Sequence, residues 1–271
     1  MEKLRISIIG CGAIGTEICK TIDTMDSSEV ELVCIVDKDN DKIEKLLKSL
    51  KISKPMVANI DTAIDNADLI VECADKKVVP EIATKAIKKG KDIMIMSSGG
   101  LVEHLELLDL ARKKDCCIYL PSGAVAGLDG LKSAMAGRVD KVTLTTRKPP
   151  NALCGAPYLE EHKIDLSKIK NEEVIFSGTA REAIKGFPAN VNVSVSLSLA
   201  GIGLDKTRVK IIADPSIRVN IHEIEIEGEF GKIRTKTENV QSPMNPRTSF
   251  LAALSAVATF KRIIDPVKIG T

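Results

Sequence analysis

Long apolar runs and an excess of one charge are both missing from this chain of 271 residues. No segment approaches the roughly 20 apolar residues that a helix needs to cross a bilayer, and the start of the chain lacks the apolar core and cleavage site of a signal peptide. The 39 Lys and Arg residues nearly balance the 37 Asp and Glu residues, which leaves a formal net charge of +2. This balance gives no reason to expect a polyanion as a partner. We therefore expect a cytoplasmic protein that binds neither membrane nor nucleic acid.

Metal-ligand spacing is also missing. The seven cysteines do not pair at the short intervals typical of zinc sites, and in a reducing compartment they are expected to stay free thiols. Most of them fall inside expected strands or helices, where cysteine behaves as a small buried hydrophobic residue, so we predict no bound metal. The composition of 44% hydrophobic and 28% charged residues is typical of a globular protein, and the length is sufficient for two domains.

The most specific pattern is LRISIIGCGAIG, residues 4–15, in which an apolar strand runs into three glycines. These glycines have the Gly-x-Gly-x-x-Gly spacing of a dinucleotide-binding turn. The first permits a tight turn, the second lets backbone approach a pyrophosphate, and the third lets the next helix pack closely. The pyrophosphate then rests on amide groups at the start of that helix. The candidate cofactor-binding residues of this turn are Gly10, Gly12, Ala13, Ile14 and Gly15.

A second apolar strand, expected at 30–36, ends in Asp37. Asp37 follows the third glycine by roughly the 20 residues at which an acidic side chain meets the adenosine ribose. A carboxylate accepts hydrogen bonds from ribose hydroxyls and repels a 2′-phosphate, so Asp37 favours NAD over NADP. Lys38 beside it relieves part of that repulsion, which leaves NADP open as the cofactor.

Strands and helices alternate through the first part of the chain. Strands are expected at 4–9, 30–36, 69–73, 92–96 and 116–120, and helices at 13–25, 40–50, 78–89 and 101–114. This alternation predicts an α/β fold with a Rossmann-type doubly wound parallel sheet, whose ligands bind beyond the carboxyl ends of the strands. Ala74 and Asp75, the turn at 97–100 and the turn at 121–127 are therefore expected to line the cofactor cleft.

Beyond these elements the pattern changes to short segments that alternate polar and apolar residues. Strands are expected at 142–146, 174–177, 209–213, 218–226 and 232–237. They predict a second, smaller α+β domain of mainly antiparallel strands. Residues 190–199 alternate with a period of two but also place apolar residues on one helical face, and we favour a helix there.

The last expected element is a helix that Asn245 caps and Pro246 begins, reaching about residue 264. We expect this helix to return to the first domain. The predicted boundaries are 1–121 together with 242–271 for a dinucleotide-binding domain, and 122–241 for a domain of substrate binding, catalysis and dimerisation.

The three histidines differ in their surroundings. On the strand expected at 218–226, His222 shares a face with Asn220 on one side and Ile224 on the other, so this face changes from polar to apolar at the histidine. The change predicts a bulge or a change of environment, of the kind found beside active sites. The residues alone are equally compatible with a histidine that ends an exposed polar face. His104 and His162 are expected to be solvated.

Six segments match one family in the order in which they occur in the chain. They are GCGAIG (10–15), PSGAVAGLDG (121–130), TTRKPP (145–150), GFPANVNV (186–193), VNIHEIEI (219–226) and NPRTSFLAA (245–253). With these segments the chain resembles the small L-aspartate dehydrogenases from end to end. The resemblance implies oxidative deamination of L-aspartate with NAD or NADP, giving iminoaspartate and then oxaloacetate and ammonia, with iminoaspartate feeding NAD biosynthesis. It also implies a homodimer, with Ala124 and Asn190 at the cofactor and His222 as the active-site histidine.

This resemblance leads to a mechanistic hypothesis. His222, titrating near neutrality, accepts a proton from the amine of aspartate and then activates the water that attacks the imine carbon. Arg147 and Lys148 are candidates to bind the two substrate carboxylates, although a solvated basic pair at a strand end fits equally. Asn190 is a candidate for the nicotinamide carboxamide or a helix cap, and Asn192 is a further candidate for the substrate.

Two other functions are compatible with these patterns. An oxidoreductase like dihydrodipicolinate reductase or homoserine dehydrogenase has the same general plan, but the paired-histidine motif of the former is missing here. A non-catalytic sensor of NADH predicts tight cofactor binding without aspartate-dependent NADH formation. Such a sensor usually carries an added DNA-binding or partner-binding module, which the sequence does not show.

Overall fold

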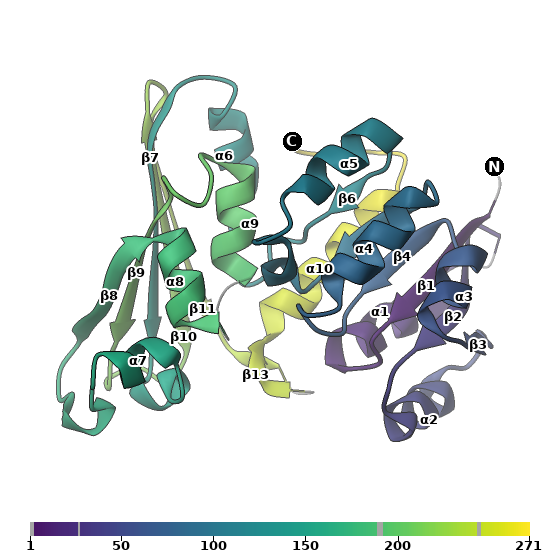
Figure 1. The fold of residues 1–271 in the computed structure, drawn as a ribbon, viewed down its shortest axis with the longest axis horizontal. Helices are drawn as coiled ribbons and strands as arrows, with labels where there is room; N and C mark the ends of the chain where they lie inside the picture. Colours follow the sequence, from purple (N-terminus) through teal and green to yellow (C-terminus); the bar gives the residue numbers. More distant parts are fainter. Residues whose placement is uncertain (1–2, 27, 189–191, 243–244) are drawn as a thin grey trace. The chain divides into compact units, whose positions relative to one another are not determined.

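The computed structural model describes residues 3–26, 28–188, 192–242 and 245–271. The chain divides into two compact units, unit 1 with Met1–Pro121 and Ala256–Asp265, and unit 2 with Ser122–Ser255 and Pro266–Thr271. Figure 1 shows the elements of each unit. Of the segment 242–271, which we expected to return to the first domain, residues 256–265 belong to unit 1.

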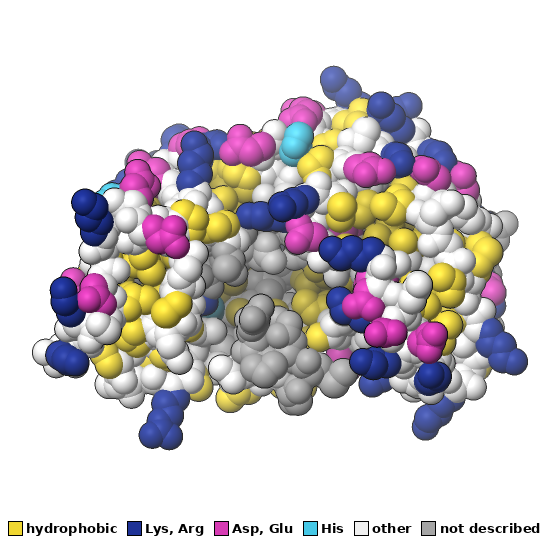
Figure 2. Space-filling view, turned by 60° about the horizontal axis from the view of Figure 1, so that its bottom comes forward, with side chains coloured by type: hydrophobic (Ala, Val, Ile, Leu, Met, Phe, Trp, Pro, Cys, Tyr) yellow, Lys and Arg dark blue, Asp and Glu magenta, His cyan; other side chains and the backbone are white. Residues whose placement is uncertain are grey.

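Charge and hydropathy at the surface follow the composition. On the face shown in Figure 2, Lys and Arg side chains lie among Asp and Glu side chains. Within the part of the chain that the structure describes, every helix is too short or too polar to cross a membrane.

The sheet of unit 1 has the strand order β3-β2-β1-β4-β5-β6, and all its neighbouring strands are parallel. Its strands are β1 (Leu4–Ile9), β2 (Val30–Val36), β3 (Met56–Val57), β4 (Leu69–Glu72), β5 (Asp92–Ile95) and β6 (Ile118–Tyr119). The chain starts in the middle of the sheet, extends it to one edge and then returns to build the other half. This order is that of a doubly wound Rossmann sheet and confirms the predicted fold class.

The helices of unit 1 connect these strands (Figure 1). They are α1 (Ala13–Asp23), α2 (Asn40–Ser49), α3 (Ile60–Asn66), α4 (Val79–Lys88), the 3₁₀ helix η1 (Ser98–Leu101) and α5 (Glu106–Lys114). Asp39 caps α2 by accepting hydrogen bonds from two amides of its first turn. The helix expected at 101–114 begins only at Glu106, because the chain first forms η1 after β5.

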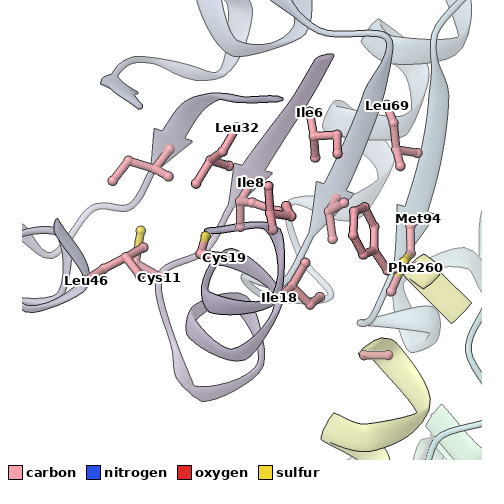
Figure 3. Close-up of a cluster of buried hydrophobic side chains, with 14 of the residues drawn as sticks. Ile6, Ile8, Cys11, Ile18, Cys19, Leu32, Leu46, Leu69, Met94 and Phe260 are labelled. Atoms are coloured by element: carbon pink, nitrogen blue, oxygen red, sulfur yellow. The ribbon is translucent and has the colours of Figure 1, made fainter. Parts of the chain in front are cut away.

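The core on one face of the unit 1 sheet is built from α1, α2 and α10 (Phe250–Ile264) (Figure 3). Ile18 of α1 and Leu46 of α2 are almost completely buried against strand residues such as Ile8. Phe260 of α10 joins the same cluster and has no exposed surface. The turn that follows β1 is therefore held by a close-packed core directly beneath it.

The sheet of unit 2 has the order β11-β10-β7-β9-β8. Its strands are β7 (Val139–Lys148), β8 (Glu173–Thr179), β9 (Arg208–Ala213), β10 (Asn220–Gly228) and β11 (Gly231–Asn239). The β7–β9 pair is parallel and the other three pairs are antiparallel, so the prediction of a mainly antiparallel second domain is confirmed.

The remaining helices of unit 2 are short. They are α6 (Leu128–Ala134), η2 (Pro150–Leu153), α7 (Pro157–Glu161), η3 (Leu166–Lys168), α8 (Ala180–Gly186) and α9 (Asn192–Ala200). The ambiguous segment 190–199 is helical from Asn192 onward. Its buried side chains are serines as well as aliphatic residues. The predicted helix start at Asn245 and Pro246 is wrong: Asn245–Ser249 forms strand β13, which pairs with β12 (Gln241–Ser242), and α10 begins at Phe250.

Candidate active site

The three glycines of the turn between β1 and α1 have different surroundings. Gly10 has a φ of 110°, and a Cβ there would lie 2.5 Å from the carbonyl of Cys73. A Cβ on Gly15 would lie 2.0 Å from the carbonyl oxygen of Gly10. A Cβ on Gly12 would meet nothing within 4 Å. Close packing of the fold thus explains why positions 10 and 15 must be glycine. Gly12 instead leaves its backbone next to open space at the start of α1, where the first amides have no acceptor within the helix.

The predicted ribose ligand lies beside this turn. One carboxylate oxygen of Asp37 accepts a hydrogen bond from the N–H of Cys11 at 2.7 Å, and the other accepts from the N–H of Asp39 at 3.0 Å. Each oxygen keeps a lone pair that can accept from a hydroxyl group. Lys38 is exposed to solvent. Unit 1 therefore brings Asp37 together with the glycine turn, as a dinucleotide-binding site needs.

Glu72 is a buried acid that the sequence patterns did not single out. It ends β4, and its carboxylate accepts hydrogen bonds from the N–H of Ala74 at 2.8 Å and from the N–H and Oγ of Ser97 at 2.9 Å. Burial raises the pKa of the Glu72 carboxyl, although these hydrogen bonds act in the opposite direction. Glu72 thereby joins Ala74 and the turn at 97–100, two predicted parts of the cofactor cleft. The sequence feature that could have identified Glu72 is its position as an acidic residue at the end of an apolar strand.

In unit 2, three buried polar side chains lie on one face of the sheet. Thr146 and Lys148 belong to β7, and His222 belongs to β10. His222 pairs with Thr146 across the two antiparallel strands, and its Nδ1 lies 3.0 Å from Thr146 Oγ1. Lys148 lies two residues beyond Thr146, so its side chain points to the same face. The structure therefore places the predicted histidine and one predicted cation together.

Two alternatives were predicted at His222, a bulge or a change of environment, and the bulge is wrong. β10 keeps an unbroken register with β11, and its register with β7 first shifts between Glu227 and Gly228. His222, Ile224 and Ile226 are all buried, as members of one continuous face. Along this face of β10, the change from polar to apolar residues at His222 therefore reflects a polar site at one end of a buried face. The strand itself is not interrupted there.

Burial sets the protonation state of this pair of bases. Burial, reinforced by the charge of Lys148, lowers the pKa of His222 to about 4. Burial also lowers the pKa of Lys148 to about 8. The prediction that His222 titrates near neutrality is therefore wrong in this environment, because its imidazole is neutral at pH 7. Near neutral pH the positive charge of the pair lies mainly on Lys148.

A small cavity adjoins Thr146 and Lys148. Its lining comprises Thr146, Lys148, Leu153, Ala183, Phe187, Ser194, Val209 and Ile211. The room for the centres of water-sized spheres is about 10 Å³, which corresponds to roughly one water molecule. The cavity therefore accommodates a water or an ammonia molecule beside Lys148 but is too small for a whole dicarboxylate.

The two cations predicted as a pair are separated by the sheet. Arg147 forms an ion pair with Glu172, whereas Lys148 shares the face of His222. Neighbouring residues of a strand alternate between faces, so β7 presents only one of the two to the histidine. Asn192 is exposed at the start of α9. Asn190 lies outside the described residues.

Ala124 lies in the turn at 121–127, which β11 holds in place. Its carbonyl oxygen accepts hydrogen bonds from Thr237 Oγ1 at 2.9 Å and from Asn239 Nδ2 at 3.0 Å. Thr237 is in turn the partner of His222 in the register of β10 and β11. The predicted cofactor contact and the predicted active-site histidine are thus anchored to the same pair of strands. No motif marked Thr237 or Asn239 in the sequence.

The other histidines and the cysteines do not form a second site of this kind. The Nδ1 of His104 lies 3.1 Å from Glu106, and the ring of His162 stacks on Tyr158. All seven cysteines are free thiols. Searched over the described residues, the chain contains no group of three or more His, Cys, Asp or Glu side chains that could hold a metal ion.

Known proteins match both units. Residues 129–263 match the family described as "Aspartate dehydrogenase, C-terminal", and residues 10–121 match "Homoserine dehydrogenase, NAD binding domain". The chain is 51% identical over 271 residues to the L-aspartate dehydrogenase of Methanosarcina mazei, covering 99% of this chain and 100% of that protein. It is 52% identical over 272 residues to the L-aspartate dehydrogenase of Methanosarcina acetivorans, with the same coverage.

Solved structures agree with these matches. The crystal structure of aspartate dehydrogenase from Thermotoga maritima has a TM-score of 0.73 at 25% identity, covering 98% of this chain and 99% of that one. A homoserine dehydrogenase from Thiobacillus denitrificans has a TM-score of 0.63 at 13% identity, which is a likeness of fold alone. Because the high identity to the two Methanosarcina proteins extends over nearly the whole chain, this protein belongs to the L-aspartate dehydrogenase family.

Proposed function

We propose that this protein oxidises L-aspartate to iminoaspartate, which water converts to oxaloacetate and ammonia, with NAD as the oxidant. The observation that carries the proposal is the buried group of His222, Thr146 and Lys148, which combines a neutral base with a cation on one face of a sheet. Membership of the family supports the same reaction.

The residues of the glycine turn fit a dinucleotide, because only Gly12 faces open space where a Cβ would stand. The amides of Gly12, Ala13 and Ile14 would hold the pyrophosphate, and Asp37 would accept hydrogen bonds from the ribose. By resemblance, Ala124 and Asn190 would also contact the cofactor. When bound, NAD supplies the acceptor for the hydride that leaves Cα of aspartate.

The buried residues of unit 2 would act on the substrate. Lys148, charged near neutral pH, would bind a substrate carboxylate. His222 has Nδ1 beside Thr146, which leaves Nε2 to bond to the amine or to the attacking water. Arg147 is engaged with Glu172, and Asn192 remains a candidate substrate contact at the start of α9.

Substrate choice tests this proposal directly. NADH formation is expected with aspartate, at a kcat/KM about tenfold or more above that for glutamate, alanine and homoserine, since a pocket distinguishes even one methylene by about that factor. NADH should also be consumed when oxaloacetate and ammonia are supplied together. Tight NADH binding without turnover of aspartate would instead identify a sensor, and a preference for homoserine would identify the alternative oxidoreductase.

Cofactor choice tests the role of Asp37. We expect kcat/KM to be about tenfold or more higher with NAD than with NADP, because a 2′-phosphate would face the Asp37 carboxylate. Asp37→Asn removes the negative charge with little change in shape and should narrow this ratio. The two values of kcat/KM are measured for both proteins under the same conditions. A strong preference of the natural protein for NADP would refute the assignment.

A role in NAD biosynthesis, a homodimeric state and a cytoplasmic location belong to the same proposal. They are supported by the resemblance of the sequence to the family and by its composition. Sedimentation equilibrium of the purified protein measures the oligomeric state, and a monomer at all concentrations would contradict that part of the proposal.

A further inference from the structure

The proposed reaction has a proton to remove before any C–H bond breaks. The amine of aspartate is protonated near neutral pH, and its nitrogen needs a free electron pair to form the C=N bond. A group in the pocket must therefore accept a proton. The need for such a group rests on the proposed function, and the ionisable side chains of unit 2 are the candidates.

Lys148 has the position of such a group. Its side chain is buried, with a relative exposure of 7%, and it reaches the small cavity described above. Of the described residues that line this cavity, Lys148 alone is ionisable. Buried lysines lose their proton more easily than exposed ones and are used as bases for that reason.

The groups around Lys148 come from several elements. From β10, His222 faces it as a neutral base. From the end of β9, Asp214 donates its N–H to the carbonyl of Lys148, while its carboxylate accepts from the N–H and Oγ of Ser216. The uncharged lining residues are Ala183 of α8, Phe187 directly after that helix, and Ser194 of α9. On β7 itself, Arg147 points to the other face.

We infer that Lys148, the buried ionisable residue at the cavity, is the catalytic base that takes the proton from the substrate ammonium, and that His222 positions the amine and the water. A pKa of about 8 for Lys148 leaves part of it neutral near physiological pH and close in basicity to an amine. A pKa of about 4 makes His222 a much weaker acceptor of that proton.

The step balances in atoms and electrons. An N–H bond of the substrate ammonium breaks, its electron pair stays on the substrate nitrogen, and the proton bonds to the neutral Nζ of Lys148. The nitrogen pair then forms the C=N bond as the hydrogen on Cα leaves with its own pair to the oxidant. The charged Lys148 that results would be stabilised by the substrate carboxylate proposed to bind to it.

Two substitutions separate a base from a permanent cation. Lys148→Arg keeps a positive charge but removes a group that can lose its proton, because arginine stays charged. We expect this variant to lower kcat by about a hundredfold or more, with KM for aspartate changed only a few-fold. Lys148→Met removes both functions and should lower kcat and raise KM. Lys210→Met, on the exposed face of β9, is the matched control and should behave like the natural protein.

The pH profile assigns the base to one residue. For the natural protein, kcat/KM should rise with pH with a midpoint near 8. This rise should persist in His222→Asn, although at a lower rate, and should move toward the ionisation of the substrate amine in Lys148→Arg. A rise that disappears in His222→Asn and stays in Lys148→Arg would overturn the inference in favour of the histidine.

Proton uptake provides a readout that does not depend on turnover. Succinate has the two carboxylates of aspartate without the amine, so its binding should raise the pKa of Lys148 and draw a proton from the buffer at pH 8. Calorimetry in buffers of different ionisation enthalpy measures this uptake. It should occur in the natural protein and in His222→Asn but not in Lys148→Arg or Lys148→Met. Melting temperature and NADH binding show that each variant is folded.

The results of these experiments distinguish a failure of the proposed function from a failure of the inference about Lys148. If the natural protein forms no NADH from aspartate, the proposed function fails whatever the variants do. If it does, but Lys148→Arg keeps kcat within a few-fold, Lys148 is only a carboxylate ligand and the inference fails while the function stands. Proton uptake that is unchanged in both Lys148 variants would also overturn it.

Discussion

His222→Ala is expected to lower kcat for aspartate by about a hundredfold or more, because loss of a group that positions or transfers a proton typically costs 10²–10⁴-fold. The imidazole is buried, and its Nδ1 lies 3.0 Å from Thr146 Oγ1, so water cannot take over its fixed orientation. NADH affinity should change only a few-fold, since the glycine turn and Asp37, proposed to hold the pyrophosphate and the ribose, belong to unit 1. Steady-state rates and NADH fluorescence measure the two effects.

Two further variants make this result specific. His222→Asn keeps a hydrogen-bonding group beside Thr146, so it should lose kcat with a smaller drop in melting temperature than His222→Ala. His104→Ala changes a histidine whose side chain is 43% exposed and pairs with Glu106, and it should retain the natural rate. A near-normal rate for folded His222→Ala would eliminate the catalytic role of the histidine.

Gly12→Ala is expected to weaken NADH binding, whereas Gly15→Ala is expected to destabilise the fold. At Gly12 the backbone has a φ of −74°, which alanine adopts, and its Cβ would meet nothing, so the fold should survive. Alanine at this helix cap costs only about 1 kcal/mol. NADH affinity should nevertheless fall tenfold or more, by about 1.4 kcal/mol, because the methyl group would occupy the place of the pyrophosphate.

At Gly15 the added Cβ would lie 2.0 Å from the carbonyl oxygen of Gly10, so the substitution should instead lower the free energy of unfolding by about 1–3 kcal/mol or more. Chemical unfolding followed by circular dichroism, together with NADH titration, separates the two cases. Natural NADH affinity in Gly12→Ala would show that the pyrophosphate does not bind at this turn.

Local patterns were sufficient for the fold class. The strand, the three glycines and Asp37 lie within one short stretch of the chain, and each has a conformational reason that involves only its near neighbours. Alternation of strands and helices then predicted a parallel sheet, and period-two segments predicted the second sheet. These features depend on spacing along the chain, which a sequence shows directly.

Features that depend on distant residues were missed or wrong. The sequence patterns did not show the ion pair of Arg147 with Glu172, because these two residues lie far apart in the chain. The start of α10 was placed too early because the pairing of β12 with β13 carries no strong local signal. Glu72 ends an apolar strand. Only the fold shows that its carboxylate accepts hydrogen bonds from both Ala74 and Ser97 and so links these two segments.

The sequence by itself determined the glycine turn proposed to bind the nucleotide, the two kinds of sheet and the family resemblance, since all of these depend on residue order and spacing. Only the tertiary structure decided that burial keeps His222 neutral and that Lys148 is the ionisable residue lining the small cavity of unit 2. The reason is that a pKa depends on burial and on nearby charge, which are set when β7 and β10 pair and the helices of unit 2 cover them.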